Sequence, residues 1–258
     1  MCRLLGYVTR NPTTLAGLLG EHDLAAFIEL SRKHGDGWGF ARAGAGTVEV
    51  HKAPEAAHAS GSFTRIAHED PADLAMVHLR WATLGLPVVS HNAHPFTDGR
   101  VAFAHNGSIR PPAALEDLLA EDVAPLLQGD TDSERFFLAV LSRLAGPVED
   151  SDAVASAYAQ AVTAITSGLA HSSLNSMLLT PTHLFAVCRY DAAEELQEEE
   201  PEYYRLRYRV LPQGVVVASS GWGRGWRDLA NGQMLVVERA TLALSIRSIA
   251  LETPRATR

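Results

Sequence analysis

Short apolar runs and one longer stretch of helical periodicity make up the first part of the sequence. Residues 2–8 (CRLLGYV) form an apolar run typical of a buried strand. Residues 14–33 carry apolar side chains at helical spacing, which predicts a helix. The glycine-rich segment HGDGWGF (34–40) would end that helix and lead into a strand, with TVEVHKA (47–53) as its hairpin partner. Two further apolar runs predict buried strands that end in polar residues: LAMVHLRWAT (74–83) and RVAFAHNG (100–107).

Helices and then a series of strands are expected in the rest of the chain. Residues 132–167 predict two helices, the first of which starts with a Thr or Asp cap and an acidic first turn. After residue 172 the pattern favours strands: LNSMLLT, HLFAVCRY, YYRLRYRV, GVVVASS, QMLVVERA and TLALSIRSI. This order predicts an α+β sandwich in which sheets face each other and helices cover the outside. Because no Pro/Gly/Ser-rich linker divides the chain, we expect a single domain over residues 1–258.

Three segments deviate from this pattern. The acidic run 191–202 is expected to be a solvated loop, with an acidic recognition site as the alternative, and the tail 251–258 to be frayed. Residues 153–188 lack Asp, Glu, Lys and Arg, but polar side chains recur and Pro181 interrupts them, so we expect no membrane span. The first 20 residues do not form a signal peptide, which predicts a cytoplasmic protein.

Composition narrows the classes of function. The chain has 258 residues and is 47% hydrophobic, which suits a globular fold with a core large enough to need no disulfide or metal. The formal net charge is −8 and the basic residues form no run, which argues against nucleic acid as a partner. The two cysteines, Cys2 and Cys188, are too few for a disulfide scaffold. These figures leave a role in small-molecule chemistry open.

Cys2 is the most informative position of the sequence. Met is commonly removed before a small residue, and the thiol and a free α-amine would then belong to one residue. An α-amine has a pKa near 7.7–8.0, so part of it is neutral at pH 7 and accepts a proton from a nucleophile. The thiolate would attack a carbonyl carbon and form a thioester that water then cleaves. The alternative is a small buried hydrophobic residue without a chemical role.

Polar residues at the ends of other elements complement this thiol. Arg80, followed by Trp81 and Thr83, ends one strand and offers a planar fork for a carboxylate. Asn106 and Gly107 end another strand and offer two N–H donors to an oxyanion. Asp132 starts a helix and offers a carboxylate to an ammonium group. Their structural alternatives are a surface ion pair, a hairpin turn and a helix cap, respectively. Together they suit the two ends of an amino acid.

The sequence resembles the class II glutamine amidotransferases, whose glutaminase domains are N-terminal-nucleophile hydrolases. The matching segments occur in the family's order: MCRLLGY, HGDGWGF (34–40), HLRWATLG (78–85), HNAHPF (91–96), AHNGSI (104–109) and GDTDSE (129–134). The late strands are also similar to the family's remaining sheet. The resemblance therefore extends over nearly the whole chain and implies a four-layer αββα sandwich.

The resemblance also implies a role for each candidate site residue. Cys2 would be the nucleophile and its own amine the base. Asn106 and Gly107 would form the oxyanion hole, and Asp132 would bind the substrate amine. Arg80 would hold the α-carboxylate in a pocket that Trp81 and Thr83 shape.

The histidines and the absence of other motifs bear on cofactors. His94 and His105 lie inside matched segments and are expected to be structural. A zinc site made of histidines is conceivable, but the residues concerned do not have metal-ligand spacing: His78, His91, His94 and His105. We therefore predict no metal and no cofactor.

Two departures from the family bear on the substrate. Leu84 stands where the sugar-phosphate amidotransferases commonly have His, and a chain of 258 residues has room for the glutaminase domain alone. The expected activity is hydrolysis of a γ-glutamyl amide, glutamine by default, through a Cys2 thioester. The alternatives are a hydrolase of a larger γ-glutamyl conjugate, as in ergothioneine biosynthesis, an ammonia-supplying subunit of a separate synthetase, a glutamine-binding sensor, and a peptide or lactone hydrolase. A homo-oligomer is also open.

Overall fold

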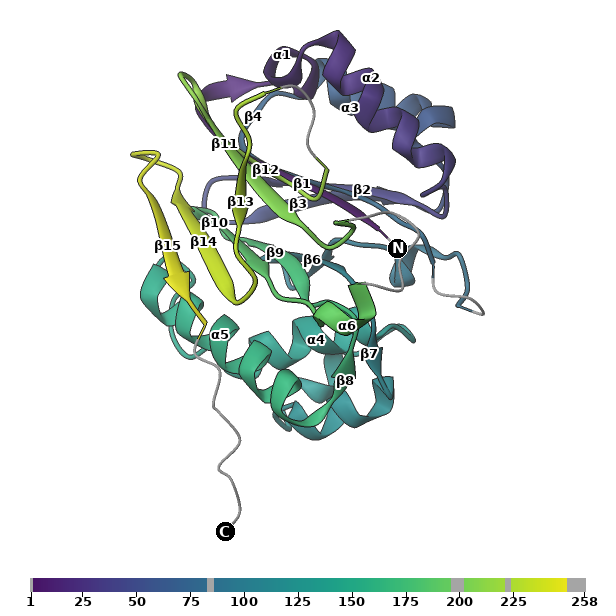
Figure 1. Ribbon diagram of the computed structural model, residues 1–258, viewed down its shortest axis with the longest axis vertical. Coiled ribbons are helices and arrows are strands. Elements are labelled where there is room, and N and C mark those ends of the chain that lie inside the picture. The colour runs from purple at the N-terminus through teal and green to yellow at the C-terminus, as the bar shows by residue number, and fades with distance from the viewer. Residues whose placement is uncertain (1, 83–85, 196–201, 221–223, 250–258) are drawn as a thin grey trace.

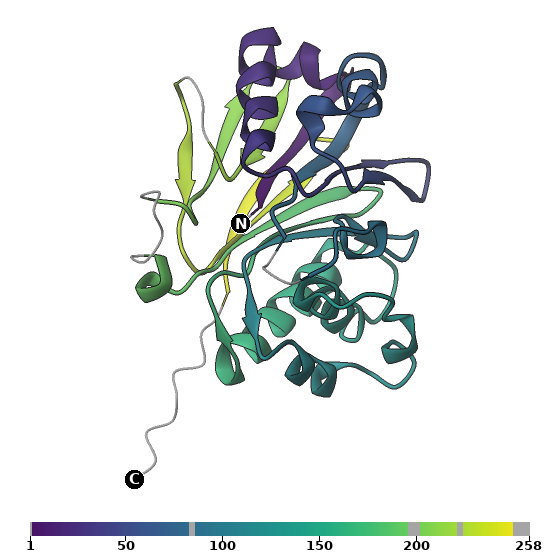
Figure 2. The same cartoon turned by 90° about the vertical axis from the view of Figure 1, so that its right-hand side faces the viewer.

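Two antiparallel β-sheets lie face to face, and helices cover both outer faces of the pair (Figure 1). This computed structural model describes residues 2–82, 86–195, 202–220 and 224–249. Seen from the side, the layers are helices, sheet, sheet and helices (Figure 2). The arrangement confirms the predicted four-layer αββα sandwich.

The first sheet has seven strands in the order β13-β11-β12-β1-β4-β2-β3. Its strands are β1 (Arg3–Thr13), β2 (Trp38–Ala43), β3 (Val48–Ala53), β4 (Ala72–Leu79), β11 (Leu206–Leu211), β12 (Gly214–Ala218) and β13 (Arg227–Leu229). In the centre β1 pairs with both β12 and β4, so the residues that precede β1 lie beside the residues that follow β4. This pairing places Cys2 next to Arg80 and Trp81.

The second sheet has six strands in the order β15-β14-β10-β9-β6-β5. Its strands are β5 (Phe96–Thr97), β6 (Ala102–Asn106), β9 (Asn175–Leu179), β10 (His183–Cys188), β14 (Gln233–Glu238) and β15 (Leu244–Ser248). A small separate pair joins β7 (Ile109–Arg110) to β8 (Ala170–His171). The end of β6 therefore carries Asn106, close to the chain that continues into β7.

The helices divide between the two outer faces. Helices α1–α3 lie on the seven-stranded sheet, and α4 and α5 lie on the six-stranded sheet (Figures 1 and 2). The α-helices are α1 (Leu15–Leu19), α2 (Glu21–Glu29), α3 (Gly61–Glu69), α4 (Asp132–Leu141), α5 (Ser151–Gly168) and α6 (Ala192–Glu195). Short 3₁₀ helices cover Leu30–Arg32, Ala57–Ala59, Ser90–Asn92, Pro112–Leu118 and Ala124–Leu126.

Alternation along the central strands divides the core into layers. Leu5 and Tyr7 of β1 pack under α1–α3, whereas Leu4 and Val8 pack against the other sheet, because successive strand residues point to opposite faces. The interface between the sheets contains several alanines, whose small side chains let the sheets approach: Ala41, Ala102, Ala104 and Ala186. Phe103 faces the other way, into the layer of α4 and α5. The small side chains of this interface thus allow the two sheets to pack closely face to face.

The structure corrects several sequence predictions. Residues 14–33 do not form one helix, because Gly20, at φ 79°, separates α1 from α2. The strand expected over 74–83 ends at Leu79, where the chain turns. The acidic run 191–202 is not wholly a loop: α6 occupies Ala192–Glu195, and the run's residues 196–201 lie outside the described residues. The tail 251–258 also lies outside them.

Other predicted features agree with the structure. Thr131 caps α4 by accepting a hydrogen bond from the Glu134 N–H. Both cysteines are free and buried, and burial raises the pKa of Cys188 to about 12, consistent with an inert thiol. Within the part of the chain that the structure describes, no helix combines the length and the apolar character needed to cross a bilayer.

Phe103 provides a test of the packing between β6 and the helices that cover it. The side chain is fully buried, with ring centroids of Phe136 and Tyr158 at 5.0 and 6.0 Å. We expect Phe103→Ala to lower the free energy of unfolding by about 3–5 kcal/mol, because it leaves a cavity in a close-packed layer. The matched control is Val210→Ala on β11, where the side chain is 57% exposed and the cost should stay below about 1 kcal/mol. Urea titration followed by circular dichroism measures both, and equal costs would contradict the layer assignment.

Candidate active site

Cys2 lies immediately before β1 and its side chain is held against the chain that follows β4. The residue is 8% exposed, the Trp81 N–H donates to Sγ at 3.5 Å, and the thiol donates to the Trp81 carbonyl at 3.7 Å. Burial raises the pKa of the Cys2 thiol, and the Trp81 N–H and the Arg80 charge act in the opposite direction. The thiol is therefore mostly protonated near neutral pH, and a base must take its proton before it can attack a carbonyl.

Arg80 is a buried cation that forms no ion pair with any carboxylate of the described residues. The residue is 3% exposed, and both Nη atoms donate to the Pro87 carbonyl at 3.3 Å. Burial lowers the pKa of the guanidinium, although it stays charged. Among the described residues no carboxylate forms an ion pair with Arg80, so the guanidinium has N–H groups to offer a ligand. A carboxylate would fit its planar fork.

The glycine-rich turn before β2 fixes the backbone of this segment. The Arg80 N–H donates to the Gly37 carbonyl at 2.8 Å, and the Asp36 N–H donates to the Arg80 carbonyl at 3.0 Å. The Asp36 carboxylate accepts from the Ala82 N–H at 2.8 Å. Gly39 is needed for close approach, because a Cβ there would lie 2.0 Å from the His94 carbonyl oxygen. The DGWG sequence thus holds the Arg80 segment on one side and the HNAHPF segment on the other.

Asn106, at the end of β6, is a fully buried amide without a hydrogen-bond partner. Its exposed fraction is 0%, and neither Nδ2 nor Oδ1 has a partner within the described part of the chain. Its neighbour across the sheet, Asn175, donates from Nδ2 to the Tyr204 carbonyl and accepts from the Arg189 N–H at 2.8 Å. The contrast is informative, because an unsatisfied buried amide costs about 1–3 kcal/mol. Asn106 is therefore suited to a ligand that supplies the missing partner.

Gly107 follows directly and lies against another chain. A Cβ at Gly107 would lie 1.9 Å from the Ser173 carbonyl oxygen, so a side chain at this position would require the backbone to move. The close approach holds the Asn106–Gly107 turn against the segment that precedes β9. This close backbone contact, and not a hairpin turn, thus explains the Asn106–Gly107 sequence.

Asp132 connects the start of α4 to the chain after this turn. Its Oδ2 accepts from the Ile109 N–H at 2.7 Å and its Oδ1 accepts from the Ser133 N–H at 2.8 Å. The residue is 8% exposed and forms no ion pair with another described residue. Thr131, and not Asp132, is the cap of α4. The carboxylate charge also tends to raise the pKa of the Cys2 thiol.

Three buried histidines support the site as neutral groups. His78 on β4 lies against His94, with ring centroids 4.1 Å apart, and burial lowers the pKa of His78 to about 3 and that of His94 well below its usual value. His105 bridges Ser133 Oγ and the Ser173 carbonyl, both at 2.9 Å from its ring nitrogens. Since a carbonyl only accepts, the Nε2–H donates to Ser173 and Nδ1 accepts from the Ser133 hydroxyl.

Metal binding finds no support in the part of the chain that the structure describes. No group of three or more His, Cys, Asp or Glu side chains there is arranged to hold an ion. His78 and His94 do lie together, but His105 is engaged with Ser133 and Ser173.

The structure brings most of the predicted residues into two groups, one on each sheet. Cys2, Arg80 and Trp81 come from the seven-stranded sheet, and Asn106–Gly107 and Asp132 come from the six-stranded sheet and its helix. Thr83 and Leu84 lie outside the described residues.

Asn92 is a residue that the sequence reasoning did not single out. It is fully buried; its Nδ2 donates to the Pro87 carbonyl at 3.4 Å, and its Oδ1 accepts from the Asp130 N–H at 3.0 Å. The Pro87 carbonyl also receives the Arg80 guanidinium, and Asp130 lies two residues before Asp132. One amide thereby joins the segments that carry the two charged site residues. Its place inside HNAHPF was the available signal.

Comparison with known proteins places this arrangement in a family. The profile described as "Glutamine amidotransferases class-II" matches residues 1–256. A glutamine–fructose-6-phosphate aminotransferase of Halobacterium salinarum is 37% identical over 136 residues, which cover 52% of this chain and 20% of that protein. The chain thus matches about a fifth of that relative's length.

Solved structures share the fold. A glutamine aminotransferase class-II domain protein from Silicibacter pomeroyi superposes with a TM-score of 0.66 at 20% identity, over 96% of this chain and 99% of that one. Glutamine phosphoribosylpyrophosphate amidotransferase from B. subtilis superposes with a TM-score of 0.65 at 16% identity, over 97% of this chain and 50% of that one. These likenesses confirm the fold of the N-terminal-nucleophile hydrolases.

The unsatisfied amide of Asn106 makes a prediction that requires no knowledge of the substrate. We expect Asn106→Leu to leave the free energy of unfolding unchanged or to raise it by about 1 kcal/mol, because the substitution removes an unpaired polar group and keeps the number and branching of the side-chain heavy atoms. The matched variant Asn175→Leu should cost about 2 kcal/mol or more, because it leaves the Arg189 N–H and the Tyr204 carbonyl without partners. Urea unfolding measures both. A loss at Asn106 as large as that at Asn175 would show that Asn106 is satisfied within the protein.

Proposed function

The chain belongs to the class-II glutamine amidotransferases, and on that premise we propose that it hydrolyses a γ-glutamyl amide through a thioester on Cys2. Glutamine is the default substrate, and glutamate and ammonia are the products. The observation that carries the proposal is the buried Cys2 thiol against the Arg80–Trp81 segment, together with two buried polar groups that the described residues leave unsaturated, the guanidinium of Arg80 and the amide of Asn106.

Substrate recognition would use the two ends of the amino acid. The Arg80 guanidinium binds the α-carboxylate, because it is buried, charged and paired with a single neutral carbonyl. Asp132 binds the α-ammonium group, because each of its oxygens retains lone-pair capacity beside its backbone contact. Trp81 would shape the carboxylate pocket, and Thr83, to which the family resemblance assigns the same role, lies outside the described residues.

The reaction follows from the chemistry of an N-terminal cysteine. After removal of Met1, the free α-amine of Cys2 takes the proton of its own thiol. The sulfur attacks the side-chain carbonyl carbon, and the Asn106 amide and Gly107 N–H donate to the oxyanion that forms. The C–N bond breaks as the amine returns the proton to the leaving nitrogen, which leaves as ammonia. Water then adds to the thioester carbonyl, the C–S bond breaks, and glutamate and the free thiol are released.

The intact mass of the purified protein tests the first step of this mechanism. A retained Met1 would block the α-amine and remove the proposed base. Loss of one Met residue is therefore required.

A larger γ-glutamyl conjugate is the second candidate substrate, and the surroundings of Trp81 favour it. The indole is 38% exposed although its backbone contacts the thiol. Lys33 lies over the ring at 5.0 Å from its centroid, and His34 meets it edge-on at 5.5 Å. An exposed aromatic surface with a cation beside it could contact a leaving group larger than ammonia.

Removal of the proposed nucleophile is the direct test of the activity. Cys2→Ala should lower glutamate release from glutamine to the level without enzyme, because no side chain then forms the thioester. Cys188→Ala is the matched control and should retain the wild-type rate, since that thiol is fully buried in β10. The measurement is glutamate production coupled to glutamate dehydrogenase. A Cys2→Ala protein that remains active would refute the proposal.

The choice between the two substrate classes rests on a kinetic comparison. We expect kcat/KM for glutamine to exceed that for γ-glutamyl amides of larger amines. The protein groups that bind the amino-acid end are the same for both substrate classes, and ammonia as the leaving group needs no further space. The assay compares glutamine with γ-glutamyl-p-nitroanilide and γ-glutamyl conjugates of amino acids. A conjugate that is cleaved at least about tenfold more efficiently than glutamine would make the second candidate the substrate class.

A further inference from the structure

Two peptide units contact the sulfur of Cys2, and both lie in the segment that follows β4. The Trp81 N–H belongs to the unit between Arg80 and Trp81, and it donates to Sγ at 3.5 Å. The Trp81 carbonyl belongs to the unit between Trp81 and Ala82, and it accepts from the thiol at 3.7 Å. Strand β4 ends at Leu79, so neither unit belongs to a strand. Their orientation must therefore come from other contacts.

Asp36 holds the other polar atom of each of these two units. Its N–H donates to the Arg80 carbonyl at 3.0 Å, and its carboxylate oxygen Oδ2 accepts from the Ala82 N–H at 2.8 Å. A trans peptide unit is planar and its C=O and N–H point in opposite directions, so a contact at one of these atoms sets the direction of the other. Asp36 and the Cys2 sulfur thus lie on opposite sides of the same two peptide units.

The next residue, Gly37, keeps Asp36 in register with this segment. The Gly37 carbonyl accepts from the Arg80 N–H at 2.8 Å. Gly37 has φ 145°, which side chains rarely allow, and a Cβ there would lie 3.1 Å from the Ala53 carbonyl oxygen. The glycine therefore lets the turn pass between β3 and the Arg80 segment, with the Asp36 carboxylate aimed at Ala82.

We propose that Asp36 is a positioning residue for the Cys2 nucleophile and that it acts through the two peptide units of Trp81. The proposal rests on the function proposed above, because it takes Cys2 as the reacting group. The Asp36 carboxylate fixes the unit between Trp81 and Ala82, and its N–H fixes the preceding unit. The carbonyl and the N–H of Trp81 then keep the sulfur in one position before and after it loses its proton.

The charge of Asp36 must be separated from its hydrogen bond. Burial lowers the pKa of the Arg80 guanidinium, and the negative charges of Cys2 and Asp36 act in the opposite direction. Asp36→Asn removes the charge but keeps an acceptor oxygen for the Ala82 N–H. Asp36→Glu keeps the charge but displaces the acceptor by one methylene group, and Asp36→Ala removes both. Positioning predicts that only the asparagine variant resembles the wild type.

Alkylation of Cys2 by iodoacetamide tests the proposal without any substrate. Near neutral pH the rate follows the thiolate fraction, and the Trp81 N–H acts to lower the pKa of the thiol. Asp36→Ala and Asp36→Glu should therefore react about threefold or more slowly than Asp36→Asn, which should stay within about twofold of the wild type. A merely loosened structure would have the opposite effect, because the thiol, in a residue now 8% exposed, would become more accessible. Mass spectrometry of the peptide that contains Cys2 gives the rate as a function of pH.

Steady-state kinetics with glutamine provide the second readout. In Asp36→Ala and Asp36→Glu, kcat should fall about tenfold or more through the misplaced sulfur, and KM should stay within about threefold. The small change in KM is expected because Arg80 keeps its contacts with the Gly37 and Pro87 carbonyls. In Asp36→Asn, kcat should stay within about threefold of the wild type.

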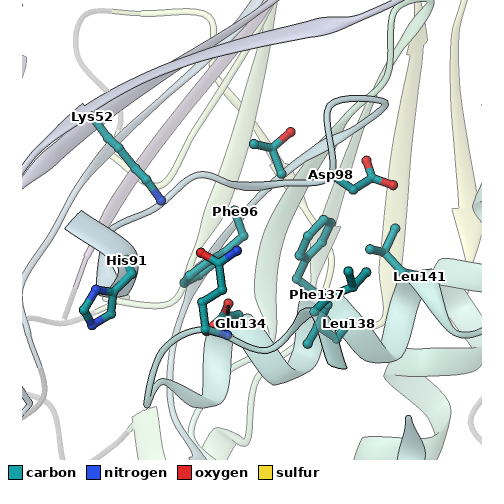
Figure 3. Close-up of a pocket in the computed structure, with 11 residues that line it drawn as sticks. Lys52, His91, Phe96, Asp98, Glu134, Phe137, Leu138 and Leu141 are labelled. Carbon is teal, nitrogen blue, oxygen red and sulfur yellow. Dashed lines mark hydrogen bonds between the residues drawn. The ribbon is translucent and has the colours of Figure 1, made fainter. Parts of the chain in front are cut away.

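Asp98→Ala is the matched control. Asp98 lies on the turn after β5 (Figure 3), and its carboxylate also accepts from a backbone N–H, that of Val101 at 3.0 Å. Its loss should leave the alkylation rate and kcat at their wild-type values, because that turn carries no residue of the proposed site. Thermal unfolding confirms that each variant is folded, and the comparison of Asp36→Glu with Asp36→Asn decides the question if Asp36→Ala does not fold.

Two results would overturn the positioning role. One is alkylation of Asp36→Ala and Asp36→Glu at the wild-type rate or faster. The other is an Asp36→Asn variant that is impaired as strongly as Asp36→Ala, which would make the charge and not the hydrogen bond decisive. A wild-type protein that does not hydrolyse glutamine would instead refute the proposed substrate, and the alkylation comparison would still decide whether Asp36 positions the sulfur.

Discussion

A buried side-chain amide without a partner costs about 1–3 kcal/mol, and the structure bears this cost at Asn106. The surrounding contacts hold the amide in place instead of satisfying it. Gly107 is packed on the Ser173 carbonyl, His105 is held at both ring nitrogens, and Asp132 grips the Ile109 N–H two residues beyond Gly107. These three groups are engaged with other partners, so they do not satisfy Asn106. The amide is thus held in position without being paired, and this preorganisation is what the proposed role of an oxyanion donor requires.

Burial also keeps the three supporting histidines neutral near neutral pH. Burial lowers the pKa of His78 to about 3 and also lowers the pKa values of His94 and His105, so their folded-state values lie below the unfolded value near 6.5. A histidine whose pKa is lowered by folding binds its proton more weakly in the native state, so it favours the unfolded state as pH falls below about 6.5. Above that pH all three are neutral in both states and contribute nothing further. The supporting histidines therefore keep the same protonation state over the pH range in which an α-amine titrates. The pH dependence of the chemistry proposed for Cys2 would then come from its own thiol and α-amine.

Much of the fold and of the candidate site could be predicted because the relevant signals are local. Short apolar runs indicated the strands, and the polar residues at their ends indicated Arg80 and Asn106. The break at Gly20 was missed because its apolar spacing continues through the glycine, and β13 was missed because Arg227–Leu229 is too short to show a period. The contacts of Asn92 and Asp36 were missed for a different reason: they are made with backbone groups of Pro87, Arg80 and Ala82. A backbone group leaves no trace in the identity of its residue, so the sequence could not indicate these contacts, and the place of Asn92 inside HNAHPF was the one available signal for that residue.

An arginine lies near each end of β4, and the surroundings of the two differ. One arginine has a structural role, and the other is available to a ligand. Near the first end, Arg239 pairs with both oxygens of Asp73, at 2.9 and 2.7 Å, and donates to the Gly44 and Pro181 carbonyls. Its fork is filled, so that end is a structural junction between the sheets. At the other end Arg80 has one carbonyl and no carboxylate. The difference cannot come from exposure, because Arg80 is the more buried of the two, with 3% of the residue exposed against 28% of the Arg239 side chain. A more buried cation has the greater need of a counter-ion, and since no described carboxylate forms an ion pair with Arg80, its surroundings agree with the proposal that it binds the substrate carboxylate.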